Sequence, residues 1–150
     1  MLVKQELDKE WLFKAKKQQE LARDSSYLKT FRWKIRKKLN LPSTEREIAS
    51  AFYQLKIGHG YFKSYLYRFS HTDTDLCTCG TAKQTPRHLL LGCPLYKTAR
   101  FKIKENLDTL YPSLNIVLNT RKGILATLEY LKETRIATRK WRLNELSEGI

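Results

Sequence analysis

The sequence contains no long apolar run. Nowhere do about 18 apolar residues follow one another without interruption, the length that a membrane-spanning helix requires. The first ten residues carry acidic side chains and do not form the apolar stretch of a secretory signal. We therefore expect no association with a membrane, and we expect an intracellular protein, nuclear or cytoplasmic.

Cysteine is scarce as well. The chain has three cysteines, an odd number, and Cys77 and Cys79 are separated by a single residue. Such a pair is poorly placed for the disulfide framework of a secreted protein. A reducing compartment, in which thiolates bind metal ions, fits this pattern better.

Acidic residues are too few to balance the basic ones. Lys and Arg total 29 and Asp and Glu total 15, which gives a formal net charge of +14. A chain with this charge repels itself unless it binds a polyanion, and nucleic-acid phosphates are the obvious partner. We expect RNA or single-stranded DNA. Any single Lys or Arg is at least as well explained as part of a solvated helix face. Only the total positive charge therefore points to a nucleic-acid partner.

The composition nevertheless favours a packed fold. Apolar residues make up 41% of the chain, with eight Tyr, six Phe and three Trp, and a length of 150 residues suits one domain. Helical periodicity dominates, so we predict a mostly α fold, a small helical domain with one insertion. Residues 1–43 are expected to form basic amphipathic N-terminal helices, 44–112 a helical segment that contains the insertion, and 113–150 a C-terminal helical segment.

The predicted helices follow from apolar spacing. Residues 1–23 and 27–39 each show a helical pattern with many basic side chains. Thr44 and Glu47 have the spacing of a capping box, which predicts a third helix over 44–57. Further helices are expected over 61–69, 87–92, 96–110 and 123–146, and residues 114–118 could form a short strand.

The helix at 27–39 and the short helix at 61–69 combine basic and aromatic side chains. Aromatic rings can stack on exposed bases while cations contact phosphates. The residues that we assign to nucleic-acid contacts are Arg32, Lys34, Arg36, Lys37, Lys38, Lys63 and Arg68.

One segment carries chemistry that core packing does not explain. Cys77, Cys79, His88 and Cys93 form the pattern C-x-C-G-x7-H-x4-C. Zinc prefers four soft or borderline ligands at the corners of a tetrahedron, and three thiolates with one imidazole meet that demand. We predict one structural Zn²⁺ at these residues, in a zinc-knuckle (C-x-C…H…C) insertion at 77–93, with all four positions filled and no catalysis by the metal. The alternative is three buried free thiols beside a surface histidine.

The residues between the ligands have predicted roles. Gly80 would let its own backbone amide approach a thiolate sulfur. His88 and Cys93 are about 140° apart around an ideal helix, so the helix must be interrupted, and Gly92 and Pro94 are placed to do so. The side chains expected to pack the site against its neighbours are Leu89, Leu90, Leu91 and Leu95.

Other polar residues near the cysteines are given simpler roles. His71 could replace a ligand, but a solvated loop histidine is favoured, and His59 between two glycines is interpreted as a turn residue. Asp73 and Asp75 have no further acids beside them and are expected to cap the turn before Cys77.

Three stretches in this region resemble a known family. They are LKIGHGYFKSYL at 55–66, DLCTCG at 75–80 and TPRHLLLGCPLY at 85–96, and together they look like the tail of fungal non-LTR (LINE-type) retrotransposon polyproteins. The likeness covers roughly residues 47–100. In that family a Cys-x-Cys, a His and a Cys form a zinc knuckle taken to help bind nucleic acid. The positions that match them here are Cys77, Cys79, His88 and Cys93.

The resemblance also implies what the chain lacks. In the family this tail follows reverse transcriptase and ribonuclease H domains, and both activities require several carboxylates around metal ions. The sequence holds no such constellation. We therefore expect a non-enzymatic tail fragment of a retrotransposon polyprotein, a zinc-stabilised module that binds RNA or single-stranded DNA. The alternative is a zinc-stabilised protein–protein interaction domain that does not bind nucleic acid.

Overall fold

The structure is a computed structural model that describes residues 2–21 and 41–147. The chain divides into two compact units, residues 1–40 and 41–150. Within the described ranges every regular element is a helix or a helical turn, and the antiparallel bridge between Leu76 and Lys83 is isolated. The predicted mostly α fold is therefore confirmed. No helix in these ranges has both the length and the apolar character needed to cross a membrane.

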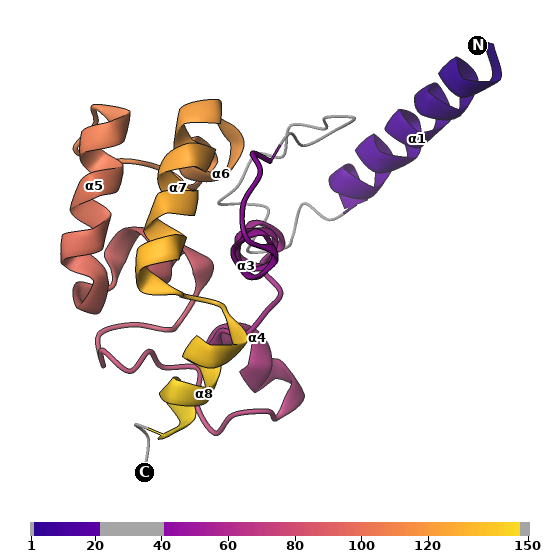
Figure 1. The fold of residues 1–150 in the computed structure, drawn as a ribbon. Coiled ribbons are helices and arrows are strands. Elements are labelled where there is room, and N and C mark those ends of the chain that lie inside the picture. Colours follow the sequence, from indigo (N-terminus) through magenta and orange to yellow (C-terminus); the bar gives the residue numbers. More distant parts are fainter. Residues whose placement is uncertain (1, 22–40, 148–150) are drawn as a thin grey trace. The chain divides into compact units, whose positions relative to one another are not determined.

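The first unit is described through one helix, α1 (Leu2–Leu21) (Figure 1). This helix confirms the one predicted over 1–23 in its described part. The predicted helix at 27–39 lies outside the described residues. The large apolar side chains that α1 exposes are Val3, Leu7, Trp11 and Phe13.

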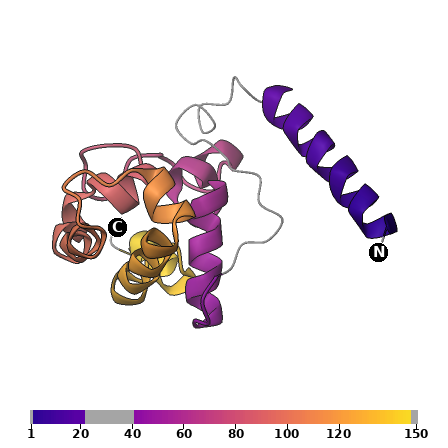
Figure 2. The ribbon, with the colours of Figure 1, turned by 90° about the horizontal axis from the view of Figure 1, so that it is seen from above.

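The second unit is built around α7 (Arg121–Thr134). Three helices pack against it: α3 (Arg46–Ile57), α5 (Lys97–Leu107) and α6 (Leu114–Asn119). In Figure 1, α5 runs beside α7 whereas α3 is seen end-on, and Figure 2 shows α3 along its length. The shorter elements are α4 (Lys63–Leu66), 3-10 turns at Tyr67–Phe69 and Pro94–Tyr96, a π turn at His88–Gly92, and α8 (Arg139–Ser147).

The core forms where apolar residues recur at helical spacing. On α3, Ile48, Phe52 and Leu55 have no exposed surface. On α7, Ile124 and Leu131 repeat the same seven-residue interval, and both are buried. Burial of one such side chain contributes about 1.5–3 kcal/mol, so these two stripes supply much of the stability of the unit.

Residues 114–118, which could have formed a strand, are part of helix α6. The hydroxyl of Ser113 caps this helix by accepting a hydrogen bond from the amide of Ile116 at 3.3 Å. Leu114, Val117 and Leu118 are all buried, and their spacing of three and four places them on one helical face. In a strand, Val117 and Leu118 would point to opposite faces.

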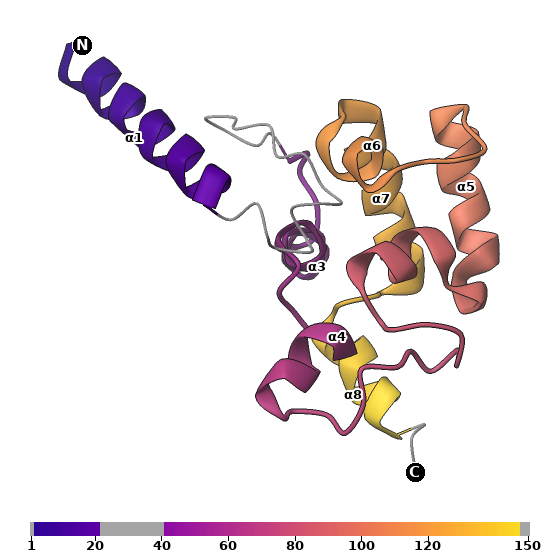
Figure 3. The ribbon, with the colours of Figure 1, turned by 180° about the vertical axis from the view of Figure 1, so that it is seen from behind.

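The single helix predicted over 123–146 is wrong, because it is interrupted. Arg135 and Ala137 have positive φ angles of 57° and 62°, which end α7 and separate it from α8. The break places Ile136 in the core with no exposed surface, and burial of this side chain helps to offset the strained backbone. α8 then lies beside α4, as Figures 1 and 3 both show.

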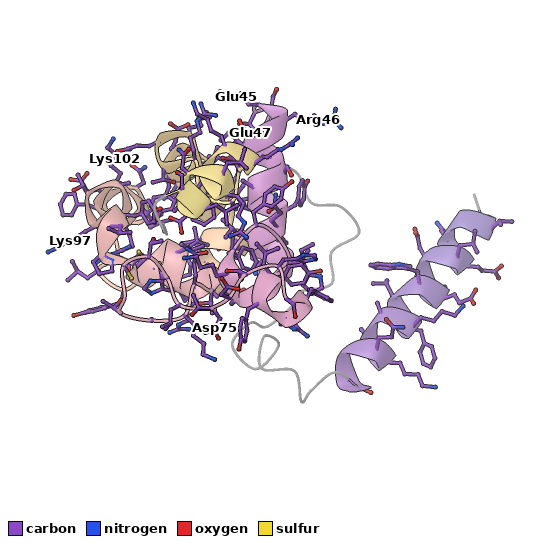
Figure 4. The ribbon with its side chains drawn as sticks, turned by 90° about the horizontal axis from the view of Figure 1, so that it is seen from below. Glu45, Arg46, Glu47, Asp75, Lys97 and Lys102 are labelled. Carbon is purple, nitrogen blue, oxygen red and sulfur yellow. The ribbon has the colours of Figure 1, made fainter. Side chains whose placement is uncertain are left out.

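The capping box predicted at Thr44 and Glu47 does not form. Glu45 is the N-cap of α3, one residue later than the spacing requires, and the hydroxyl of Thr44 is buried with no hydrogen-bond partner among the described residues. Glu45 and Glu47 instead lie 2.9 Å and 3.7 Å from the guanidinium of Arg135. These ion pairs are exposed, so solvent screening keeps their contribution to stability small. Figure 4 shows both carboxylates at this end of α3.

Gly123→Ala is expected to lower the melting temperature. A Cβ at this position would overlap the carbonyl oxygen of Ile116 and lie 2.7 Å from the hydroxyl of Thr120, so α6 and α7 would have to separate. Overpacking of this kind costs about 1–3 kcal/mol. Thermal unfolding followed by circular dichroism measures the effect. Gly92→Ala is the control, because a Cβ there would meet only Nδ1 of His88 at 3.6 Å; equal melting temperatures for the two variants would contradict the tight contact.

Candidate metal centre

Cys77 and Cys79 lie at the tip of a small hairpin. The amide of Cys77 donates to the carbonyl of Ala82 at 2.9 Å, and the amide of Gln84 donates to the carbonyl of Asp75 at 2.8 Å. Gly80 closes the turn with a φ of 74°, a conformation that side chains disfavour. The hairpin thus directs both thiols toward the same point.

The expected role of the Gly80 amide is wrong. This amide donates to the carbonyl of Cys77 at 2.9 Å and not to a sulfur atom. The amide of Thr81 lies 3.5 Å from Sγ of Cys79, and the hydroxyl of Thr81 lies 3.1 Å from it. Gly80 provides the turn, whereas Thr81 provides the contacts to sulfur.

His88 and Cys93 are brought together by a π turn. In an α-helix these two residues point about 140° apart, but here the amide of Cys93 bonds to the carbonyl of His88 at 2.7 Å, which closes a turn of five residues. The hydroxyl of Thr85 accepts from the amide of His88 at 3.1 Å and fixes the start of the turn. The wider π turn, and not only a break in the helix, therefore allows the side chains of His88 and Cys93 to point to the same site.

The four predicted ligands converge. Their ligand atoms all lie within 4.8 Å of one another. Sγ of Cys77 lies 3.8 Å from Sγ of Cys93, and Sγ of Cys79 lies 3.2 Å from Nε2 of His88. Two sulfur atoms at about 2.3 Å from one tetrahedral zinc ion are about 3.8 Å apart, so the spacing suits such an ion. The cluster could hold one metal ion.

The protein environment affects two of the thiols in opposite ways. Burial raises the pKa of Cys93 to about 12. Burial also acts to raise the pKa of Cys79, but hydrogen bonds from Thr81, His88 and Cys77 outweigh it and lower this pKa to about 6. At neutral pH, Cys79 is a thiolate ready to bind a cation, whereas Cys93 must lose a proton.

Gln84 connects the cluster to α4 and α8. Its side chain is 1% exposed, and Nε2 lies 3.8 Å from Sγ of Cys77 and donates to Oε2 of Glu145 at 2.8 Å. Its Oε1 accepts from the amide of Lys63 at 2.8 Å. One amide group therefore contacts a ligand sulfur and two helices at once.

Glu145 is a buried carboxylate with several partners. It is 7% exposed, and the hydroxyl of Thr78 donates to it at 3.1 Å. The ammonium of Lys63 lies 3.9 Å away and offsets its charge. These contacts attach α8 to the hairpin, since a buried carboxylate without partners would be strongly destabilising.

The leucines around the π turn behave differently from one another. Leu89 and Leu90 have no exposed surface, as expected, whereas Leu91 is half-buried and Leu95 is 59% exposed. Leu95 follows Pro94 in a 3-10 turn that points it outward, so its predicted packing role is wrong.

Polar groups from α5 and α7 complete the support of this segment. The hydroxyl of Tyr130 donates to the carbonyl of Leu89 at 2.6 Å, and Arg100, only 8% exposed, donates to the carbonyl of Cys93 at 2.7 Å. No pattern in the sequence pointed to Arg100, Gln84 or Glu145 as part of the site. Arg100 and Glu145 lie on helices where charges are common, so no local pattern distinguished them from exposed residues.

The remaining polar candidates lie outside the cluster. His71 is exposed, and its carbonyl accepts from Arg142 at 3.1 Å. His59 stacks on Tyr65, with ring centroids 4.6 Å apart. Asp75 forms an ion pair with Lys83 at 2.8 Å, and Figure 4 shows Asp75 at the edge of the unit.

The structure places two of the seven residues assigned to nucleic-acid contacts. Lys63 has a side chain only 13% exposed and faces Glu145. Arg68 is exposed in the 3-10 turn. Five others lie outside the described residues: Arg32, Lys34, Arg36, Lys37 and Lys38.

Comparison with known proteins reveals similarity to retrotransposable elements. The chain is 30% identical over 98 residues to the Retrovirus-related Pol polyprotein from type-1 retrotransposable element R1 of Popillia japonica, a match over 65% of this chain and 35% of that protein. It is 39% identical over 46 residues to the Putative 115 kDa protein in type-1 retrotransposable element R1DM of Drosophila melanogaster, a match over 31% of this chain and 4% of that protein. No protein-family model matches, and no solved structure matches significantly.

The similarity supports the predicted relation to retrotransposon polyproteins. Both relatives come from insects, so the fungal part of the resemblance is not supported. The matches span about a third of one relative and a small fraction of the other.

Loss of one ligand should abolish metal binding. We expect one metal ion per purified chain, and none in Cys93→Ser or His88→Ala, because three remaining ligands hold the ion too weakly. Both variants should also unfold at lower temperature. Metal content measured by atomic spectroscopy tests this expectation. His71→Ala removes a histidine outside the cluster and should keep its metal; a folded wild-type chain without metal would refute the site.

Metal affinity should fall as the pH falls. Burial keeps Cys93 protonated at neutral pH, with a pKa of about 12, so each bound ion displaces at least one proton. The affinity should therefore drop by at least about tenfold per pH unit between about pH 8 and 6. The drop should steepen below about pH 6, where Cys79 also becomes protonated. Competition with a chromophoric chelator measures this slope, and an affinity independent of pH would contradict thiolate coordination.

Proposed function

We propose that the cluster binds one structural zinc ion and that the zinc-stabilised second unit belongs to a nucleic-acid-binding module. The observation that carries this proposal is the convergence of Cys77, Cys79, His88 and Cys93 within 4.8 Å. Three sulfur atoms and one imidazole nitrogen favour zinc over magnesium or calcium, which prefer oxygen ligands.

The zinc ion would be structural and not catalytic. Four protein ligands fill a tetrahedral shell, so no position remains for water or substrate. Three thiolates around one dication leave a net charge of minus one, and Arg100, which donates to the carbonyl of Cys93, would moderate it. The ion would fix the hairpin to the π turn and, through Gln84, to α4 and α8.

Nucleic acid is the partner that the charge favours. A net charge of +14 on 150 residues creates a strong positive potential, and phosphate backbones neutralise it. The similarity to retrotransposon polyproteins is consistent with such a partner. We infer a non-enzymatic, intracellular segment of such a polyprotein that binds RNA or single-stranded DNA.

A protein-docking role is the second candidate, and α1 favours it. Val3, Leu7 and Trp11 recur every fourth residue and are 70%, 61% and 53% exposed. Such a stripe can enter an apolar groove of a partner. Binding through this stripe would depend weakly on salt, which separates it from binding to phosphates.

The salt dependence of binding tests the nucleic-acid proposal. We expect the wild-type chain to bind labelled single-stranded RNA and DNA, with an affinity that falls steeply as salt rises, because Lys and Arg release counterions from phosphates. Replacing the five assigned cations Arg32, Lys34, Arg36, Lys37 and Lys38 by glutamine should reduce the slope of log affinity against log salt concentration by between one and about 3.5. Fluorescence anisotropy measures both quantities.

A charge-matched variant is the control. It also replaces five cations by glutamine, at exposed positions that form no ion pair or hydrogen bond with the described residues, and its slope should change less. An affinity independent of salt, or equal slopes for the two variants, would contradict the assignment. The five control positions are Lys97, Arg121, Lys122, Arg139 and Lys140.

A further inference from the structure

A row of aromatic rings lies on the second unit, away from the cysteines. His59 stacks on Tyr65 with ring centroids 4.6 Å apart and an angle of 21° between the ring planes. Tyr65 meets Phe69 edge-on at 5.1 Å, and Phe69 lies 6.5 Å from His71. We call these four residues the ring row. It joins the turn before α4 to the loop after the 3-10 turn.

Most of the ring row is open to solvent. Phe69 is 55% exposed, His59 and His71 are exposed, and Tyr65 is half-buried against Phe62 in the core. Tyr67 adds a further ring that is 51% exposed. Contiguous exposed rings of this kind mark a binding surface, whereas single exposed apolar residues are common.

The backbone beneath the rings is fixed by hydrogen bonds. The amide of His71 donates to the carbonyl of Leu66 at 3.1 Å, and Arg142 of α8 donates to the carbonyl of His71 at 3.1 Å. The start of α4 is held by Gln84, which accepts from the amide of Lys63. The backbone that carries the rings is therefore fixed before any ligand binds, which lowers the entropic cost of binding.

The charges around the ring row are suited to an anionic ligand. Arg68 lies between Tyr67 and Phe69 in sequence, is exposed, and has no hydrogen bond or ion pair with the described residues. Arg142 lies behind His71 and carries a positive charge. One nitrogen of its guanidinium group, Nη1, is buried and has no hydrogen-bond partner among the described residues. Lys83 of the hairpin interacts electrostatically with Tyr67, but its ammonium is paired with Asp75 at 2.8 Å.

We propose that the ring row binds unpaired bases of single-stranded nucleic acid by stacking, while Arg68 contacts a neighbouring phosphate. This inference rests on the proposed function, because it names the surface and the form of nucleic acid. Aromatic rings accept any base on their faces, so the row would bind without strong sequence preference. Bases within a duplex are already stacked on one another and are not available to it.

A second exposed apolar surface shows why the ring row is the better candidate for nucleic acid. A cavity on α5 combines Phe101 and Leu110 with one cation, Lys104, and two acids, Glu105 and Asp108. Those carboxylates would repel phosphates. Within residues 59–71, by contrast, the exposed large apolar side chains are all aromatic: Tyr61, Tyr67 and Phe69.

The test compares Phe69→Ala with Phe101→Ala, since these side chains are 55% and 59% exposed. The probe is a fluorescein-labelled oligothymidine of about ten nucleotides, within the usual length of a single-strand site. We expect Phe69→Ala to weaken binding about 5- to 100-fold, because one stacking contact with a base is lost. The slope of log affinity against log salt concentration should not change, because every phosphate contact is kept. Phe101→Ala should bind as the wild type does, and Phe69→Trp should retain binding.

Two further measurements separate stacking from charge. Arg68→Gln should reduce the salt slope by about 0.7, because one phosphate contact is lost. The wild type should bind an abasic strand of the same length more weakly than it binds the oligothymidine. Phe69→Ala should bind this abasic strand with the same affinity as the wild type, because there is no base to stack. Circular dichroism and metal content confirm that each variant is folded.

The outcomes distinguish this inference from the proposed function. If the wild type does not bind the oligonucleotide at low salt, the proposed function fails and the inference fails with it. If the wild type binds with a steep salt dependence but Phe69→Ala and Phe101→Ala behave alike, only the ring row is overturned. In that case its rings would be a surface for another class of partner, such as a protein.

Discussion

The convergence of three sulfur atoms and one imidazole nitrogen is the constraint on which the centre of the second unit depends. Residues 70–86 contain little regular structure apart from an isolated bridge, and most of their side chains are polar. Such a segment cannot fold on its own by burying apolar surface. A metal ion that joined the hairpin to the π turn would provide the missing cross-link, as structural zinc does in other small domains.

The effect of this constraint extends beyond the ligands. Gln84 touches a ligand sulfur, a buried carboxylate on α8 and the first amide of α4. Arg100 and Tyr130 fasten the π turn to α5 and α7 through backbone carbonyls. The positions of α4 and α8 therefore depend on the metal ligands, whereas α3, α6 and α7 pack through their own apolar stripes.

The sequence predicted the parts that short-range patterns determine. Helical spacing of Ile48, Phe52 and Leu55 identified α3, and the cysteine and histidine spacing identified the cluster that the structure assembles. Predictions from the sequence were wrong or missing where contacts between distant residues determine the structure. The break at Arg135 is favoured by burial of Ile136 and by ion pairs with α3, neither of which is visible in local sequence. In the sequence, Glu145 cannot be distinguished from an exposed acidic residue. Its burial beside Gln84 is visible only in the folded structure.

The separation of these contacts along the chain affects the order in which they can form. Cys77 and Cys93 are 16 residues apart, so the ligands can meet by closing a short loop. Gln84 and Glu145 are 61 residues apart, and Thr78 and Glu145 are 67 apart. During synthesis, which proceeds from the N-terminus, the whole ligand set leaves the ribosome well before α8 does. A metal ion captured at that stage would give the nascent chain a preformed surface, onto which α8 could later fold through Glu145, Arg142 and Trp141.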